Sequence, residues 1–332
     1  MSTRLVFIVW YKHSRRATTL AAELGGQVSF YYESGLAGRS LTLLRYLVQG
    51  WKTWQFLERE QPESVIVQVP PIFALLVVAA WCELRGKTNP SGHRVSYAID
   101  CHTGTFYDSR WRWALPLLRL LSRRAAVTLV ASEAALGILQ CWRVKCLFLV
   151  DGLPTFNPST STIGLEGETR VAVISGFGTD EPVTEVFAVA RLLPQVTFYM
   201  TGDSKRAAVR LLAHKPENVI LTGFLKDSDY IGLLKNVHGL VDLTKEPNIL
   251  TCGMYEALAV GKPVVVSDWP QIKRYFTRGF IYVNNSPAEI AAGIKKLLNE
   301  QGKLTTEVIA MGSELVTRRQ PKFEELVTLL QS

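Results

Sequence analysis

Short apolar runs alternate along the chain with longer segments whose hydrophobic residues recur at helical spacing. Five apolar runs in the first half are predicted as buried strands: residues 4–9, 28–32, 64–69, 94–100 and 126–131. The segments between them, among them residues 16–24, 41–60 and 72–84, are predicted as helices. A further helix ends near Arg123 with Pro116 in its first turn, where the fixed φ of proline is tolerated. Continuous apolar strands separated by helices indicate a parallel sheet covered on both faces.

The same alternation starts again after residue 168. Small, polar and proline-containing residues over 152–168 interrupt the pattern and are typical of a linker. Five more strands are then predicted, with helices between them, at residues 171–174, 197–200, 219–221, 240–243 and 263–267. A last amphipathic helix is predicted, after a break, at residues 321–330.

The fold class expected from this pattern is α/β, with two tandem doubly wound, Rossmann-like parallel-sheet domains facing a central crevice. We expect an N-terminal domain over residues 1–155, a linker over 156–168 and a C-terminal domain over 169–319. The helix of residues 320–332 is expected to pack back on the first domain.

Composition is typical of a globular protein in a reducing compartment. Of 332 residues, 48% are hydrophobic, which excludes disorder. The five cysteines form no C-x-x-C pair, so neither a zinc cluster nor a disulfide framework is indicated. The apolar run 5–10 is too short for a signal peptide. The run 65–82 is long enough to suggest a membrane span, but Gln68 and the two prolines after it interrupt it. We therefore expect a cytoplasmic location.

Basic residues are concentrated in the first half of the chain. Residues 1–150 hold 18 Lys and Arg against 9 Asp and Glu, whereas residues 151–332 hold 19 against 20. The first domain is therefore expected to face an anionic partner such as a diphosphate, a phospholipid or a nucleic acid. Nucleic acid is the weakest of the three, because no recognised nucleic-acid module accompanies the charge.

The most specific chemistry lies in residues 241–268, VDLTKEPNILTCGMYEALAVGKPVVVSD. A strand ends near Leu243, a polar loop follows, and a helix is predicted from Thr251 to Gly261. At the start of that helix, free backbone N–H groups and the positive end of the helix dipole stabilise an anion, above all a diphosphate. Glu256 lies in the next turn, where its carboxylate can accept two hydrogen bonds from a ribose diol.

This segment resembles the donor-binding segment of GT-B glycosyltransferases, especially the group 1 (GT4-like) enzymes. Their signature has two acidic residues eight positions apart, then a helix of small residues and a G-x-P-V strand. Glu256, within YEALAVGKPVVVSD, matches the second acid, and Asn248 stands at the position of the first. Asparagine can hydrogen-bond to a sugar hydroxyl without carrying a charge, and Glu246 is the alternative for that contact. The resemblance implies a GT-B fold and a UDP- or GDP-linked sugar as co-substrate, with no further cofactor.

The first half also has segments with a family resemblance. IVQVPPIFALL and YAIDCHTGTFYD are similar to the Q-x-P-P and I-D-x-H segments of the β-1,4-mannosyltransferases that elongate lipid-linked chitobiose. SGFGTDEPVTEVFAVARLL is similar to the first strand and helix of their donor domain, although it lacks the Arg/Lys pair found there in many group 1 enzymes. The similar segments are separated from one another but are distributed over most of the chain. The resemblance implies a lipid-linked or polysaccharide acceptor.

Asp100 and His102 end a predicted strand of the first domain and should face the crevice. If the transfer inverts configuration, one of them would take the proton of the attacking acceptor hydroxyl, with Asp100 the first choice and His102 the second. If it retains configuration, His102 would contact the donor sugar. The alternative is structural, with Asp100 capping the loop. Cys101 and His102 are a poor nucleophilic pair, because adjacent residues at a strand end point to opposite faces.

Charged and aromatic side chains supply the remaining candidates. His13, Arg15 and Arg16 follow the first predicted strand and suit a diphosphate or carboxylate on the acceptor, or else form a solvated basic turn. Lys245 is favoured for the departing diphosphate, with Lys205 and Arg206 as further candidates. The full set of donor-binding candidates is Gly176, Phe224, Lys245, Glu246, Asn248, Thr251, Cys252, Gly253 and Glu256.

No metal site is expected. Asp227 and Asp229 form a D-x-D pattern, but they open a predicted helix that Asp229 would cap. GT-B enzymes usually dispense with a metal, because a helix dipole and basic side chains neutralise the departing diphosphate, and the resemblance implies the same for this chain.

Tryptophan and arginine are interleaved in two segments of the first half, WKTWQFLERE and SRWRWALPLLRLLSRR. Trp111, Trp113, Leu117, Leu120 and Arg123 suit the interface of an anionic membrane, on its inner face. The alternative is that the aromatic side chains belong to the core and the arginines to solvent.

The function expected is a cytoplasmic, metal-independent glycosyltransferase that moves a hexose from a nucleotide sugar on the second domain to an acceptor on the first. Two alternatives stay open at this point: a non-catalytic, nucleotide-sugar-binding scaffold subunit, and a GT-B nucleotide-sugar epimerase. The choices between UDP and GDP and between inversion and retention are also open.

Overall fold

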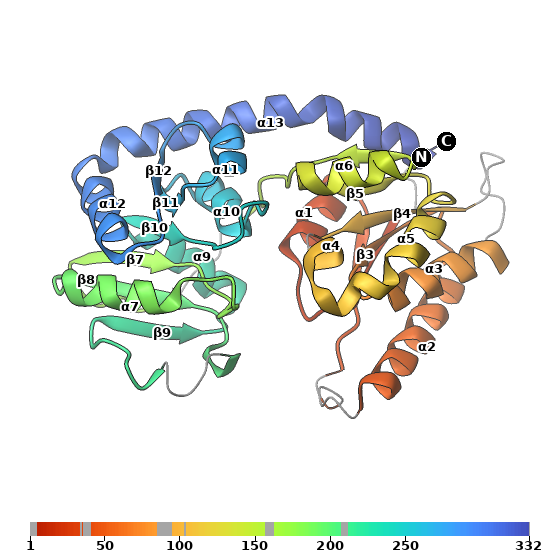
Figure 1. Cartoon of the computed structure of the whole chain (residues 1–332), viewed down its shortest axis with the longest axis horizontal. Helices are drawn as coiled ribbons and strands as arrows, with labels where there is room; N and C mark the ends of the chain where they lie inside the picture. The colour runs from red at the N-terminus through yellow and green to blue at the C-terminus, as the bar shows by residue number, and fades with distance from the viewer. Residues whose placement is uncertain are drawn as a thin grey trace. The chain divides into compact units, whose positions relative to one another are not determined.

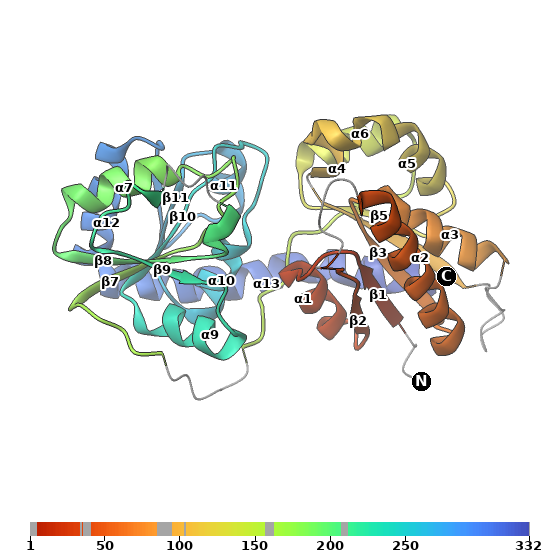
Figure 2. The same cartoon turned by 90° about the horizontal axis from the view of Figure 1, so that it is seen from below.

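The chain folds into two compact units in the computed structural model (Figure 1). The structure describes residues 5–33, 35, 41–84, 95–102, 104–156, 163–206 and 212–331, with the side chain of Arg206 left out. Unit 1 comprises Met1–Gly152 with Arg318–Ser332, and unit 2 comprises Leu153–Thr317. Figures 1 and 2 show that each unit has a central sheet with helices on both sides.

Unit 1 is built on a six-stranded parallel sheet with the order β2-β1-β3-β4-β5-β6. Its strands are β1 (Leu5–Val9), β2 (Gln27–Phe30), β3 (Ser64–Val69), β4 (Ser96–Cys101), β5 (Thr128–Val130) and β6 (Cys146–Phe148). Its helices are α1 (Arg15–Glu23), α2 (Thr42–Glu60), α3 (Ile72–Leu84), α4 (Gly104–Tyr107), the 3₁₀ helix η3 (Ser109–Ala114), α5 (Leu115–Ser122) and α6 (Glu133–Cys141). The sequence predicted every strand of this sheet except β6.

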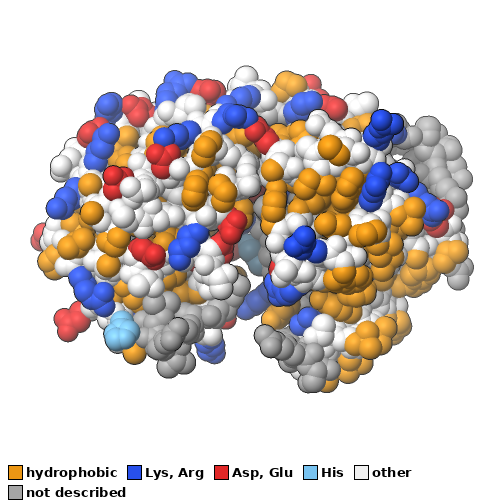
Figure 3. Space-filling model, in the orientation of Figure 1, with side chains coloured by type: hydrophobic (Ala, Val, Ile, Leu, Met, Phe, Trp, Pro, Cys, Tyr) orange, Lys and Arg blue, Asp and Glu red, His pale blue; other side chains and the backbone are white. Residues whose placement is uncertain are grey.

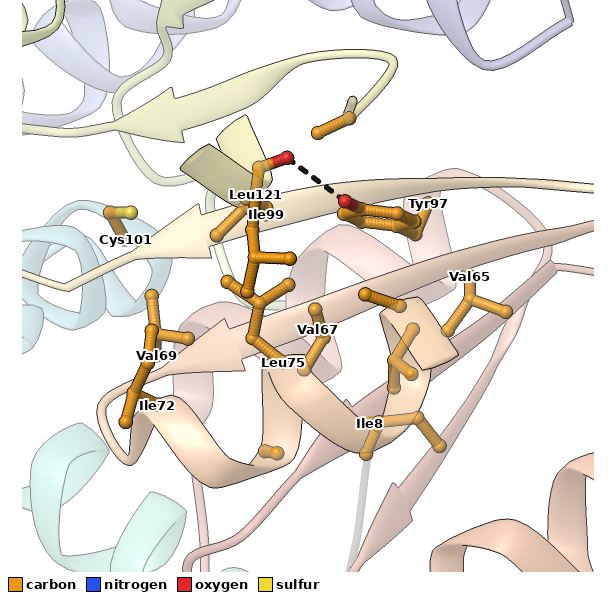
Figure 4. Close-up of a cluster of buried hydrophobic side chains, with 14 of the residues drawn as sticks. Ile8, Val65, Val67, Val69, Ile72, Leu75, Tyr97, Ile99, Cys101 and Leu121 are labelled. Carbon is orange, nitrogen blue, oxygen red and sulfur yellow. Dashed lines mark hydrogen bonds between the residues drawn. The ribbon is translucent and has the colours of Figure 1, made fainter. Parts of the chain in front are cut away.

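Alternate residues of the central strands enter two different cores of unit 1. Ile8 and Val67 pack with residues of α2, α3 and α5 on one face, whereas Phe7 and Ile66 pack with α1 and with Leu326 on the other. Figure 4 shows the first core, where the Tyr97 hydroxyl donates to the carbonyl of Leu121 at 2.9 Å. The buried strand faces explain the continuous apolar runs that the sequence shows.

Unit 2 has a second six-stranded parallel sheet, with the order β12-β11-β10-β7-β8-β9. Its strands are β7 (Thr169–Val173), β8 (Val196–Thr201), β9 (Val219–Gly223), β10 (Gly239–Asp242), β11 (Val264–Ser267) and β12 (Phe280–Val283). Its helices are α7 (Val183–Leu192), the 3₁₀ helix η4 (Ser204–Arg206), α9 (Asp227–Asn236), α10 (Cys252–Val260), α11 (Pro270–Tyr275) and α12 (Pro287–Asn299). The sequence did not predict β12.

The helix α13 (Gln301–Gln331) corrects the expected break before residue 321. It is one helix with Pro321 inside it, and it starts in unit 2 and ends in unit 1. In unit 1, Leu326 is buried, and the Ser64 hydroxyl donates to the carbonyl of Leu330 at 3.1 Å. No described helix combines the length and apolar character that crossing a membrane requires.

Candidate active site

The candidate donor site lies at the carboxyl ends of β7 and β10 in unit 2. These strands are neighbours in the sheet, although the chain passes through β8 and β9 between them. The connections leave this point in opposite directions, and ligands of doubly wound sheets bind where the strand order reverses in this way. The two segments that the sequence singled out for the donor follow these two strands directly.

The start of α10 is held close to the end of β10. Thr251 is the N-cap residue of α10, but its side chain makes no capping bond, and its hydroxyl donates instead to Oδ2 of Asp242. A Cβ atom on Gly253 would lie 2.4 Å from that oxygen, so only glycine permits this approach. Cys252, between them, is exposed. The predicted helix start is confirmed, and its backbone N–H groups lie at the sheet edge where an anion is stabilised.

Glu256, the acid matched by the family signature, is a buried residue of α10 and is 4% exposed. The hydroxyl of Tyr230, from α9, donates to its Oε2 at 2.5 Å. This hydrogen bond holds the carboxylate in one orientation, as recognition of a diol requires. Sequence reasoning missed Tyr230, whose one signal is its place in the first turn of the helix that follows β9.

Asp242 is a second buried carboxyl that sequence reasoning did not select. It is 4% exposed and accepts a hydrogen bond from the Thr251 hydroxyl, and the backbone N–H of Met254 also favours its ionised form. Burial, helped by the charges of Glu256 and Glu181, outweighs both and raises the pKa of Asp242 to about 7. A group that titrates near neutral pH therefore lies beside the predicted diphosphate position. The signal for it was an acid at the end of an apolar run, in GLVD.

The amide of Gly176, a predicted donor contact, is occupied by a carboxylate of the same loop. The Gly176 N–H donates to Oε1 of Glu181 at 2.8 Å, and the Ser175 hydroxyl donates to Oε2. Glu181 thus binds the backbone position that would otherwise be open to a phosphate. Gly176 can bind the donor only after this carboxylate has moved away.

Three further candidates lie in the loop between β10 and α10. The side chains of Lys245 and Glu246 are exposed, and Asn248 is half-buried. Backbone bonds fix the start of the loop, because the Lys245 N–H donates to the carbonyl of Asp180 at 2.7 Å. The Glu246 N–H donates to the Thr244 hydroxyl at 3.1 Å. The loop carries these candidates to the same end of the sheet as α10, and their contacts with substrate stay predictions.

The remaining candidates of unit 2 lie on neighbouring segments. Phe224 follows β9 and is 61% exposed, as a side chain that covers a base would be. Lys205 is exposed in η4, and the side chain of Arg206 lies outside the described residues. Asp227 and Asp229 lie in the first turn of α9, whose N-cap is the residue before Asp227. The prediction that Asp229 caps this helix is therefore wrong.

In unit 1, Asp100 is the centre of a buried charge network. Arg16, from the first turn of α1, donates from Nε to Asp100 Oδ1 at 2.8 Å, from Nη1 to the carbonyl of Leu149 at 2.9 Å, and to Asp151. Burial alone would raise the pKa of Asp100, but the charge and hydrogen bond of Arg16 and the nearby His102 side chain lower it to about 2. Asp100 is fully buried, so its carboxylate cannot touch a substrate.

His102 connects this network to the surface. Its Nε2 atom lies 3.4 Å from Asp100 Oδ2, its side chain is 34% exposed, and its backbone N–H donates to the carbonyl of Val69 at 2.9 Å. The structure therefore reverses the expected order of the two residues: His102 can reach a hydroxyl group, and Asp100 can orient His102. Cys101 points into the core, and burial raises the pKa of its thiol well above the ordinary value, which agrees with its exclusion as a nucleophile.

The three basic candidates after β1 separate into different environments. Arg16 is only 7% exposed and forms ion pairs with Asp100 and Asp151. The prediction that it contacts an acceptor anion is therefore wrong, and its role is structural. His13 is exposed and stacks on Phe30 at a centroid distance of 6.1 Å, and Arg15 is half-buried. His13 and Arg15 are left as the acceptor-side candidates.

Residues 183–300 match the family model for glycosyl transferases group 1. The chain contains a group 1 glycosyltransferase domain. The match includes α10, Glu256 and the loop that holds Lys245, and it confirms that the protein is a glycosyltransferase. A comparison with curated protein sequences found no match.

Solved glycosyltransferase structures superpose on nearly the whole chain. Anabaena HepE, crystallised with UDP and glucose, aligns with a TM-score of 0.70 at 16% identity, over 98% of this chain and 99% of that one. Sucrose-phosphate synthase from Thermosynechococcus elongatus aligns with a TM-score of 0.68 at 12% identity, over 99% and 98%. S. aureus TarM aligns with a TM-score of 0.61 at 17% identity, over 86% of this chain and 59% of that one. These likenesses confirm the GT-B fold, while the resemblance of the N-terminal segments to chitobiose β-1,4-mannosyltransferases stays a prediction.

Proposed function

We propose that this glycosyltransferase moves a hexose from a UDP- or GDP-linked sugar, bound by unit 2, to a lipid-linked or polysaccharide acceptor, bound by unit 1. The main support for the proposal is an arrangement within the group 1 domain. The helix α10 supplies both backbone N–H groups at its N-terminus and the buried carboxylate of Glu256, which Tyr230 orients. This helix begins at the point where the strand order reverses. Amides suit a diphosphate, and an oriented carboxylate suits a ribose diol.

UDP is the donor nucleotide that the proposal favours over GDP. Anabaena HepE, which has the same fold at 15% identity and a TM-score of 0.71, was crystallised with UDP-glucose. We assign the diphosphate to the first amides of α10, with Lys245 as its cation, and the base to the exposed ring of Phe224. Because these groups neutralise the leaving diphosphate without an ion, the proposal includes metal independence.

On the acceptor side, His102 is proposed as the base that takes the proton of the attacking hydroxyl. An imidazole that is partly exposed on one side and faces a carboxylate on the other is the arrangement that general-base catalysis uses. Asp100, held ionised by Arg16, fixes the orientation of the ring and stabilises the imidazolium that forms. His13 and Arg15 are proposed to contact an anionic group of the acceptor.

The ribose contact of Glu256 gives the most direct test of the donor site. Replacing Glu256 by Gln is expected to weaken UDP binding about 10- to 100-fold, because hydrogen bonds to a charged group contribute about 1.5–3 kcal/mol. Binding of 2′,3′-dideoxyuridine diphosphate, which lacks the diol, should change little in the same variant. Glu217→Gln, at an exposed site of unit 2, is the control and should bind UDP as the wild type does. Equal losses for both nucleotides would contradict the assignment of Glu256 to the ribose.

Membrane contact is proposed for unit 1 on the basis of its exposed apolar side chains. Leu43, Leu47 and Trp51 recur every four residues on α2 and are 71%, 63% and 61% exposed. Figure 3 shows hydrophobic side chains gathered over unit 1 with Lys and Arg side chains among them. Of the residues predicted for a lipid surface, Trp113, Leu120 and Arg123 are exposed, whereas Trp111 and Leu117 pack against the core and are withdrawn from this role.

The triple variant Leu43→Ser, Leu47→Ser, Trp51→Ser is expected to lose most of its binding to vesicles that contain anionic phospholipid, measured by flotation. Exposed apolar side chains and nearby basic residues together drive interfacial binding, so removal of the apolar part should be sufficient. The matched control replaces exposed apolar residues of unit 2, Leu192→Ser with Ile309→Ser. Equal flotation of both variants would show that α2 is not the contact.

A further inference from the structure

Two carboxylates of unit 2 lie beside the backbone segments that suit the donor phosphates. Asp242 accepts from the Thr251 hydroxyl and lies against Gly253 at the start of α10, and Glu181 accepts from the Gly176 amide after β7. Both carboxylates lie where the strand order of the sheet reverses. The chain therefore places its own carboxylates where a diphosphate would bind.

The two carboxylates differ in whether they can move away when a ligand binds. Glu181 is half-buried on a loop, so its side chain can rotate away from Gly176. Asp242 is 4% exposed, ends a strand, and has Gly253 packed so closely that a Cβ atom there would lie 2.4 Å from its Oδ2. Asp242 cannot leave, and it can lose its negative charge only by binding a proton.

The surroundings of Asp242 favour its neutral form when another anion arrives. The charged groups that act on it are Glu256 from α10 and Glu181 from the β7–α7 loop, and both are carboxylates. Within the described part of the chain, no lysine or arginine forms an ion pair with Asp242. A diphosphate at the N-terminus of α10 would add further negative charge to a buried site, where charges are poorly screened.

We infer that Asp242 takes up a proton when the diphosphate of the donor binds at the start of α10, so that donor binding weakens as the pH rises. The inference rests on the proposed donor site. Burial raises the pKa of Asp242 to about 7, so its carboxyl group takes up or releases this proton near neutral pH. Donor binding then moves the pKa of Asp242 further up, because the new charge opposes its ionisation.

The test is calorimetric titration of the full chain with UDP-glucose, and with GDP-mannose in parallel, between pH 6.5 and 8.5. Each phosphate of these diesters keeps one charge over this range, so the ligand itself does not titrate. Affinity of the wild type is expected to fall roughly tenfold or more across the range. Titration at pH 7.5 in two buffers of different ionisation enthalpy should show net proton uptake, a readout that needs no variant.

Two variants test which carboxyl group takes up the proton. Asp242→Asn should bind with an affinity independent of pH and without proton uptake, whereas Glu181→Gln should keep both the slope and the uptake. Wild-type binding that is independent of pH, or a slope that persists in Asp242→Asn and is lost in Glu181→Gln, would overturn the inference and leave the donor site standing. Failure of both nucleotide sugars to bind at any pH would overturn the donor site and the inference with it.

Discussion

Replacing His102 by Ala is expected to lower kcat about 10²- to 10⁴-fold, the range over which a positioned general base accelerates a proton transfer. Of Asp100, Arg16, Asp151 and His102, His102 has the most exposed side chain, at 34%, and it directly follows β4 where the chain leaves the sheet. The attacking hydroxyl must lose its proton as the bond to the anomeric carbon forms. Without the imidazole, only water is left to accept it.

Initial rates of nucleoside diphosphate release at saturating donor and acceptor measure this effect. UDP affinity should stay unchanged in the variant, because His102 belongs to unit 1 and the nucleotide site to unit 2. His214→Ala, an exposed histidine of unit 2 outside the site, should retain the wild-type rate. A His102→Ala enzyme with wild-type kcat would remove His102 from the role of base.

Replacing Arg16 by Met is expected to lower the free energy of unfolding by about 3–5 kcal/mol, the cost of leaving one partner of a buried ion pair alone. Arg16 is 7% exposed and neutralises both Asp100 and Asp151. In the variant, Asp100 would be a fully buried carboxylate with no cation on it. Activity should fall as well, because Asp100 would no longer be fixed against His102.

The loss of unfolding free energy in Arg16→Met should depend on pH. In the wild type, the pKa of Asp100 is lowered from 3.8 to about 2. The ionised carboxylate therefore contributes stability above pH 4, and this is lost as the pH falls toward 2. The difference between variant and wild type should be largest near pH 7 and should shrink as the carboxyl groups become protonated.

Urea unfolding of both proteins at several pH values measures this difference. Arg110→Met is the matched control, because Arg110 pairs with Asp108 at 2.5 Å but is 82% exposed. Exposed pairs contribute about 0–1 kcal/mol, so this variant should unfold almost as the wild type does. Equal losses of stability in the two variants would contradict the account of the Arg16 network.

The fold could be predicted from the sequence because most strands are buried on both faces. Val65, Ile66 and Val67 enter the cores of unit 1 on alternate sides, so the run is apolar throughout and stands out. The missed strands β6 and β12 are only three and four residues long, so each gives a short apolar signal. The missed continuity of α13 has another cause, since Pro321 is a residue that usually ends a helix.

The site was predictable only where local sequence determines it. The start of α10 could be located because Gly253 and the small residues after it belong to one helix. The role of Asp100 could not, because it depends on Arg16, which is 84 positions away. From the sequence, Arg16 was expected to contact an acceptor anion or to belong to a solvated basic turn, and only the fold shows that it is buried. Glu181 could not be selected from the sequence either, since nothing local shows that it would bind Gly176.

The most direct test of the account is calorimetric titration of the wild-type chain with UDP and with GDP, each with and without magnesium. The account predicts micromolar binding of one nucleotide, UDP before GDP, with the same affinity whether or not magnesium is present. Binding of neither nucleotide would contradict the donor site at α10, and binding only in the presence of magnesium would contradict the metal-independent mechanism.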